Sequence, residues 1–138
     1  MNIDAICNGV VIDHITAGYG MRLYQLLGLE ELDVSVAIIK NVTSRKLGRK
    51  DIIKIDAPIP VNLDVIGFVD PGATVNIIRD GKLIEKKNIE MPAELRNVIR
   101  CNNPRCITTT EQELPHIFRL TDREKKIYRC VYCETKAQ

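Results

Sequence analysis

Two short motifs decide the fold of the C-terminal region: Cys101-Asn-Asn-Pro-Arg-Cys106 and Cys130-Val-Tyr-Cys133. One pair of cysteines is separated by four residues and the other by two, and 23 residues lie between Cys106 and Cys130. Two closely spaced pairs on one chain are typical of a structural zinc site, in which each pair supplies two thiolates. Four thiolates leave no coordination position for water. The pattern therefore predicts one structural Zn²⁺ per chain and no catalytic ion.

Two disulfide bonds are the alternative interpretation of the same cysteines. The sequence opens without a secretory signal pattern, so we expect a cytoplasmic, reducing location in which disulfides are rare. A segment of about 40 residues also buries too little apolar surface to fold alone, whereas a structural zinc contributes an apparent ~10–16 kcal/mol. These arguments favour zinc. The remaining cysteine, Cys7, lies in an apolar stretch, where a small buried side chain is expected.

The composition indicates a globular chain of one domain or two small ones. It has 138 residues, of which 45% are hydrophobic and 28% are charged. The net charge is only +2 and there are four Tyr and two Phe, which argues against a nucleic-acid partner. No apolar run approaches the ~20 residues of a membrane span, so no membrane partner is expected.

Residues 1–92 predict alternating strands and helices. Asn8-Gly9 is expected to kink or bulge the first strand, Gly28 to end the first helix, Asn62 to cap the second, and Asp80-Gly81 to form a hairpin turn. The expected strands are 3–15, 34–42, 51–55, 73–79 and 82–89, and the expected helices are 21–27 and 62–69. This β-α-β-β-α-β order with one extra hairpin strand predicts a ferredoxin-like α+β sandwich with an antiparallel sheet.

Residues 93–138 predict a small β-rich zinc domain. Residues 91–99 are expected to connect the two domains and to include a short helical turn after Pro92. Residues 98–100 and 127–129 each lead into a cysteine pair and are expected to be short strands.

One face of the sheet carries polar and branched side chains together. Side chains alternate faces along a strand, so Lys50, Ile52 and Lys54 share one face, as do Asn76 and Ile78. Lysines can meet phosphates, an amide can bind a base or sugar edge, and isoleucine can pack on a flat ring. A nucleotide would suit this surface, and an ordinary solvated strand face is the alternative.

Asp13-His14 invites comparison with acid–base catalysis. A structural, hydrogen-bonded pair at a strand end is the simpler interpretation. No phosphate-binding glycine loop, nucleophile elbow or spaced carboxylate pair accompanies it. No catalytic residue is therefore assigned.

Three further motifs occur in one order with the cysteine pairs: Gly9-Val-Val-Ile-Asp-His-Ile15, Gly48-Arg-Lys-Asp-Ile-Ile-Lys-Ile55 and Pro71-Gly-Ala-Thr-Val-Asn76. With them, nearly the whole chain resembles the regulatory chain of aspartate carbamoyltransferase. The resemblance implies a non-catalytic subunit in pyrimidine biosynthesis. Its domain 1–92 would bind nucleotide effectors, CTP and ATP with UTP as a further candidate, and would form a homodimer. Its domain 93–138 would contact the catalytic chain in a hetero-oligomer.

The resemblance also implies a set of site residues. The metal ligands would be Cys101, Cys106, Cys130 and Cys133. The nucleotide contacts would be Ala5, Ile6, Asp13, His14, Lys50, Ile52, Lys54, Asn76, Ile78 and Lys86. Two alternatives remain beside this reading: a zinc-ribbon nucleic-acid-binding module and a small enzyme using Asp13 and His14.

Overall fold

The computed structural model describes residues 6–137, which belong to two compact units. The first unit is Met1–Glu90 and the second is Met91–Gln138. No helix in the described part of the chain has the length and apolar character needed to cross a membrane.

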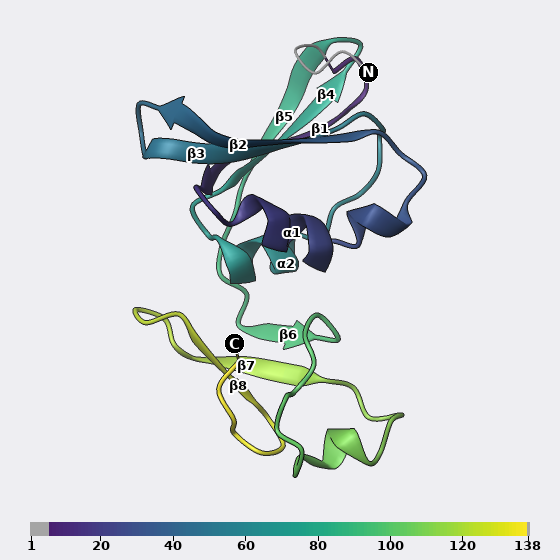
Figure 1. Ribbon diagram of the computed structural model, residues 1–138, viewed down its shortest axis with the longest axis vertical. Helices are drawn as coiled ribbons and strands as arrows, with labels where there is room; N and C mark the ends of the chain where they lie inside the picture. The colour runs from purple at the N-terminus through teal and green to yellow at the C-terminus, as the bar shows by residue number, and fades with distance from the viewer. Residues whose placement is uncertain (1–5, 138) are drawn as a thin grey trace. The chain divides into compact units, whose positions relative to one another are not determined.

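The first unit is a five-stranded antiparallel sheet whose one side is covered by two helices (Figure 1). The strand order is β2-β3-β1-β4-β5. The elements are β1 (Gly9–Thr16), α1 (Gly20–Leu26), the 3-10 helix η1 (Leu29–Glu31), β2 (Val36–Ser44), β3 (Gly48–Ile55), α2 (Leu63–Val69), β4 (Thr74–Arg79) and β5 (Lys82–Asn88). The predicted ferredoxin-like α+β arrangement is confirmed.

Most of the predicted stops and caps of this unit are confirmed. Gly28 adopts the left-handed conformation, with φ of 68°, directly after the last turn of α1. The Asn62 side chain accepts a hydrogen bond of 3.0 Å from the Asp64 backbone N–H and caps α2. Asp80 and Gly81 both have positive φ, which suits the tight turn between β4 and β5.

The first strand differs from its prediction. It begins at Gly9, after a bend at Cys7–Asn8, and runs to Thr16, while residues 3–5 of the predicted strand lie outside the described residues. A second irregularity, which the sequence did not predict, lies at Asp13–His14. A Cβ on Gly9 would clash with the Ile55 carbonyl oxygen, so the glycine permits close approach of two strands. Cys7 is exposed, so the prediction of a buried side chain was wrong.

The core of the first unit lies between the sheet and the helices. Ile12, Ile53 and Val75 stand in register on adjacent strands and are each 0% exposed. Leu23 of α1 and Ile66 of α2 are also fully buried. Because this side of the sheet supplies the core, the opposite side is left open.

The second unit is a three-stranded antiparallel sheet in the order β6-β7-β8, joined by long loops. Its elements are β6 (Glu94–Arg96), the 3-10 helix η2 (Ile107–Thr109), β7 (Ile117–Asp122) and β8 (Ile127–Cys130). Leu95, Phe118 and Cys130 stand in register and are buried. The predicted strand before Cys130 is confirmed.

Two predictions for the second unit were wrong. Residues 98–100 form no strand, and no helical turn follows Pro92. Instead, Glu94–Arg96 pairs with β7, which the sequence reading had not identified. Much of the expected connection between the domains is therefore an edge strand of the second unit.

Candidate functional site

The four cysteines of the two motifs meet in the second unit. Their sulfur atoms all lie within 4.8 Å of one another. The Sγ atoms of Cys101 and Cys133 are 3.5 Å apart, and those of Cys106 and Cys130 are 3.7 Å apart. A tetrahedron with Zn–S bonds of about 2.3 Å requires sulfur–sulfur distances of about 3.8 Å. The cluster therefore has the size and the ligand type of a four-thiolate metal site.

The same distances exclude disulfide bonds in this conformation. A disulfide needs sulfur atoms about 2.05 Å apart, and the shortest described pair is 3.5 Å apart. All five cysteines are free thiols. The four clustered residues can instead hold a metal ion together.

Local hydrogen bonds hold the cysteine loops in place. The Thr108 hydroxyl donates to the Cys106 sulfur at 3.1 Å, and the Cys133 sulfur lies 3.2 Å from the Thr135 hydroxyl. The Asn103 side chain donates to the same Thr135 hydroxyl at 3.1 Å, which ties the first loop to the second. These contacts surround the sulfurs and restrict their positions.

The sulfurs differ in acidity. Burial raises the pKa of Cys101 to about 12, and hydrogen bonds with the other thiols add to the effect. Burial also raises the pKa of Cys130. For Cys133, burial acts in the same direction, but hydrogen bonds from Thr135 outweigh it and lower the pKa to about 6. A metal must displace protons from the first two residues, so its affinity must fall as the pH falls.

The open side of the first unit's sheet carries a row of side chains that crosses the strands. Val11 of β1 pairs with Lys54 of β3 on one side and with Asn76 of β4 on the other. Asn76 in turn pairs with Lys86 of β5. The structure therefore places Lys54, Asn76 and Lys86 in one row, with the apolar Val11 between two of them.

One buried polar atom in this row has no partner. The Oδ1 atom of Asn76 is the one buried side-chain nitrogen or oxygen without a hydrogen bond among the described residues. An unsatisfied buried acceptor costs about 1–3 kcal/mol. This oxygen can therefore accept a hydrogen bond from a ligand that lies over these side chains.

A β-bulge shapes the next part of the open face. β1 pairs with β3 at Ile12↔Ile53 and again at Ile15↔Asp51, so Asp13 and His14 together oppose Ile52. His14 has a φ of 57°, which the bulge requires. The extra residue brings Asp13 and His14 side by side onto the edge of the row.

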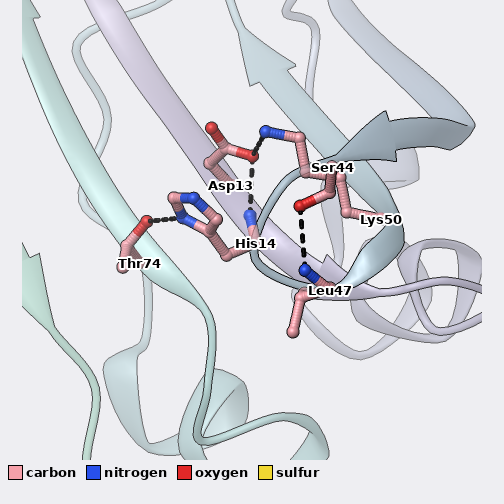
Figure 2. A network of polar contacts seen from close by, with 6 residues as sticks. All are labelled: Asp13, His14, Ser44, Leu47, Lys50 and Thr74. Atoms are coloured by element: carbon pink, nitrogen blue, oxygen red, sulfur yellow. Dashed lines mark hydrogen bonds and ion pairs between the residues drawn. The ribbon is translucent and has the colours of Figure 1, made fainter.

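Both bulge side chains have partners (Figure 2). Lys50 forms an ion pair of 2.9 Å with Asp13 Oδ1, which also accepts the His14 backbone N–H at 2.6 Å. The His14 ring nitrogen Nδ1 lies 3.0 Å from the Thr74 hydroxyl. The His14 ring has no described hydrogen bond to the Asp13 carboxylate, so the two side chains do not form an acid–base dyad.

The pKa of Asp13 reflects this environment. Burial raises it, but the hydrogen bonds from Lys50 and the His14 backbone, together with the positive charge of Lys50, outweigh burial. The pKa of Asp13 therefore lies below its ordinary value. The carboxylate keeps its charge and holds the Lys50 ammonium at the edge of the row.

Eight of the ten predicted contact residues lie on the open face or its bulge: Asp13, His14, Lys50, Ile52, Lys54, Asn76, Ile78 and Lys86. Ala5 lies outside the described residues. Ile6 is 8% exposed, so it is buried just before β1. Sequence reasoning missed Val11 and Thr74, which alternation along β1 and β4 would have placed on the same face.

Comparisons with known proteins match both units. The family model described as "Aspartate carbamoyltransferase regulatory chain, allosteric domain" matches residues 1–90. The model described as "Aspartate carbamoyltransferase regulatory chain, metal binding domain" matches residues 93–138. The first contains the open face and the second contains the cysteine cluster.

Curated relatives are similar over almost their whole length. The aspartate carbamoyltransferase regulatory chain of Clostridium tetani is 50% identical over 135 residues, which are 97% of this chain and 94% of the relative. That of Clostridium acetobutylicum is 47% identical, covering 97% and 92%. That of Bifidobacterium longum is 41% identical, covering 100% and 99%.

Proposed function

Because this chain belongs to the family of aspartate carbamoyltransferase regulatory chains, we propose that it binds nucleoside triphosphates on its open sheet face and relays their effect to a catalytic chain. The family establishes a regulatory, non-catalytic subunit with an allosteric domain and a metal-binding domain. CTP and ATP are the proposed effectors, and UTP is a further candidate. The proposed complex acts in pyrimidine biosynthesis in the cytoplasm.

The unpartnered Asn76 Oδ1 atom is the observation that carries the nucleotide proposal. It needs a hydrogen-bond donor, and a ribose hydroxyl or a base amino group is one. Lys54 and Lys86 lie in the same cross-strand row. Nucleotides combine such donors with negative charge, so one ligand can donate to the Asn76 oxygen and place its phosphates near both lysines.

The other residues of the face fit the remaining parts of a nucleotide. Ile52 and Ile78 offer branched apolar surface on which a base can pack. Lys50 is held at the bulge by Asp13 and can meet phosphate oxygens. The face thus offers both apolar and cationic side chains, which suits a ligand that has a flat base and charged phosphates.

Zinc is the proposed metal, held by all four clustered cysteines. Four soft thiolates at tetrahedral separations favour Zn²⁺ over hard cations such as Mg²⁺ or Ca²⁺. When bound, the ion would fix the two cysteine loops as one rigid structure. The chemistry that it supplies is structural, because four protein ligands leave no site for a substrate.

The proposed docking partner of the metal domain is the catalytic chain. Ile107 follows Cys106 directly and is 50% exposed, and Tyr132 lies between Cys130 and Cys133 and is 38% exposed. Exposed aromatic and aliphatic anchors beside arginine are typical of interface hot spots, and Arg105 lies next to Cys106. These side chains project from loops that the metal would order.

A homodimer through the first unit is also proposed. β5 lies at the edge of the sheet, and its Leu83 and Ile84 side chains are 56% and 59% exposed. An edge strand has unpaired backbone groups, and two exposed apolar side chains on it can pack against another chain. Sedimentation of the chain at concentrations above micromolar should give a dimer, and a monomer would contradict this proposal.

A matched pair of lysines on β5 tests the nucleotide site. Lys86 pairs with Asn76 on the open face, whereas its neighbour Lys87 pairs with the buried Val75 and points to the other side. Calorimetric titration of the full chain with CTP and ATP should show weaker binding for Lys86→Ala and normal binding for Lys87→Ala. Equal effects of the two substitutions would mean that the nucleotide is attracted by overall charge and has no site on this face.

A further inference from the structure

Asp51 is a fully buried acidic residue in β3, directly between two residues of the proposed site. Its side chain is 0% exposed. It faces the helix-covered side of the sheet, whereas its neighbours Lys50 and Ile52 face the open side. A buried carboxylate is costly unless its oxygens are well hydrogen bonded. The hydrogen-bond donors to Asp51 therefore show which parts of the chain this residue holds in place.

Three backbone N–H groups donate to the Asp51 carboxylate. Gly18 and Gly20 each donate to Oδ2 at 3.0 Å, and Asn41 donates to Oδ1 at 2.9 Å. Hydrogen bonds to an ionised acceptor are stronger than neutral ones. A Cβ on Gly20 would lie 2.9 Å from Oδ2, so a glycine is needed for this approach.

The three donors come from two segments of the chain. Gly18 lies in the turn between β1 and α1, Gly20 is the first residue of α1, and the N-cap residue of that helix makes no side-chain cap. Asn41 belongs to a bulge in β2, where its φ is 59°. The buried Asp51 side chain of β3 thus forms hydrogen bonds to the segment that follows β1 and to β2, the two strands on either side of β3.

The Asn41 hydrogen bond lies within the β2 bulge, and the Gly18 and Gly20 hydrogen bonds lie after the β1 bulge. β1 regains its pairing with β3 at Ile15↔Asp51, directly after the Asp13–His14 bulge. β2 regains its pairing at Val42↔Lys50, directly after the bulge that contains Asn41. A one-residue slip would remove either bulge and turn the following side chains to the opposite face. The Asp51 hydrogen bonds oppose both slips.

We propose that Asp51 is a positioning residue of the ligand site, which keeps both bulges in register and so sets where Asp13 and Lys50 face. This inference rests on the proposed function, because the ligand in question is the proposed nucleotide. Asp51 itself does not touch the ligand, since it lies on the far side of the sheet. It acts through the backbone of its two neighbouring strands.

Asp51→Asn is the direct test, because the two side chains have the same size. A carboxamide has one acceptor oxygen, so its NH₂ group must face at least one of the three N–H donors. We expect the strands to shift and Lys50 to move away from Asp13. A ¹³C NMR titration of the Asp13 carboxyl should then show a higher pKa than in the wild-type chain. This readout needs no nucleotide.

The second readout is nucleotide affinity. Asp51→Asn should weaken CTP binding to the full chain about tenfold or more by calorimetry. Asn62→Ala is the control, because it removes the cap of α2 and destabilises the same unit far from the bulges. The control should change neither the pKa of Asp13 nor the affinity for CTP.

Gly20→Ala is a second test of whether Asp51 positions the ligand site, and it is used if Asp51→Asn does not fold. Its added Cβ pushes against Asp51 Oδ2, so it should change the pKa of Asp13 and the CTP affinity in the same directions by smaller amounts. A folded variant with an unchanged Asp13 pKa and CTP affinity within about threefold of wild type would overturn the proposal. A wild-type chain that binds no CTP would refute the proposed function, and the Asp13 pKa would still decide the role of Asp51.

Discussion

The two units of the chain differ in how much apolar surface they bury. In the described residues, fourteen buried hydrophobic side chains lie in the first unit and six in the second, and three of those six are cysteines. The first unit therefore has a core of its own, built between one side of its sheet and two helices. The second has Leu95, Phe118 and Tyr128 around a cysteine cluster that could hold a metal ion, and we expect this ion to complete its core.

This difference determines what each unit can do. A sheet whose core lies on one side can leave its other side open, where the unsatisfied Asn76 oxygen lies in one row with Lys54 and Lys86. A unit ordered by metal ligation presents its outer loops only when the metal is bound. Ligand binding should therefore be independent of the metal, and docking should depend on it.

The largest expected effect is the loss of one metal ligand. Cys130→Ser should unfold the second unit, because an incomplete tetrahedron forfeits most of the ~10–16 kcal/mol of metal-linked folding. Metal content and limited proteolysis of residues 91–138 measure this. Cys7→Ser is the matched control, since Cys7 is exposed and lies outside the cluster. A protease-resistant second unit in Cys130→Ser would contradict the metal-dependent fold.

The second-largest effect is expected for a substitution on the open face of the first unit, and it should change nucleotide affinity alone. Lys54→Ala removes one of the two cations of the row, and a hydrogen bond to a charged group contributes about 1.5–3 kcal/mol. CTP and ATP should bind about 10- to 150-fold more weakly by calorimetry. Metal content should stay normal, and Lys87→Ala should bind both nucleotides as the wild-type chain does. Normal affinity of Lys54→Ala would place the nucleotide elsewhere.

Coupling between the units is expected to be of similar or smaller size. Allosteric coupling is reciprocal and typically amounts to ~1–3 kcal/mol. A substrate analogue bound to the catalytic chain should change CTP affinity about 5- to 150-fold in the assembled complex. It should leave the affinity of the free regulatory chain unchanged. An equal change in both would show that the analogue binds the regulatory chain itself.

The smallest expected effect concerns the bulge. The folded pKa of Asp13 lies below its ordinary value, because Lys50 and the His14 N–H outweigh burial. Its stabilising contribution is therefore present above the unfolded pKa of ~3.9 and is lost as the pH falls through the folded pKa. Lys50→Ala should raise the pKa of Asp13 in an NMR titration and remove that contribution. An unchanged pKa would show that the ion pair is weak in solution.

The first unit could be predicted well from sequence because its signals are local. Gly28 and Asp80-Gly81 act through their own backbone conformations, Asn62 acts through a side-chain hydrogen bond to the backbone two residues on, and all three behave as predicted. The alternation of Lys50, Ile52 and Lys54 likewise places them on one face. The bulges could not be predicted, because they depend on Asp51 and on backbone donors that are distant in sequence.

The second unit was harder to predict because its strands are short and because one of them pairs with a strand that is distant in the sequence. β6 is only three residues long and begins two residues after Pro92. The residues of β7 with which it pairs are more than twenty positions away in the sequence. Within β7, Phe118-Arg-Leu-Thr121 does alternate apolar and polar side chains, which is a signal for this strand. The cysteine spacing was the stronger signal. It predicted which residues form the metal-ligand cluster, but it did not predict the strands of the sheet beside that cluster.

We propose that nucleotide binding and docking reside in separate units and that only docking depends on a metal. CTP affinity and binding to the catalytic chain are measured on one preparation of the chain, first with its metal bound and again after chelation. We expect CTP affinities within about threefold of each other and loss of catalytic-chain binding after chelation. Loss of both activities together, or retention of both, would contradict it.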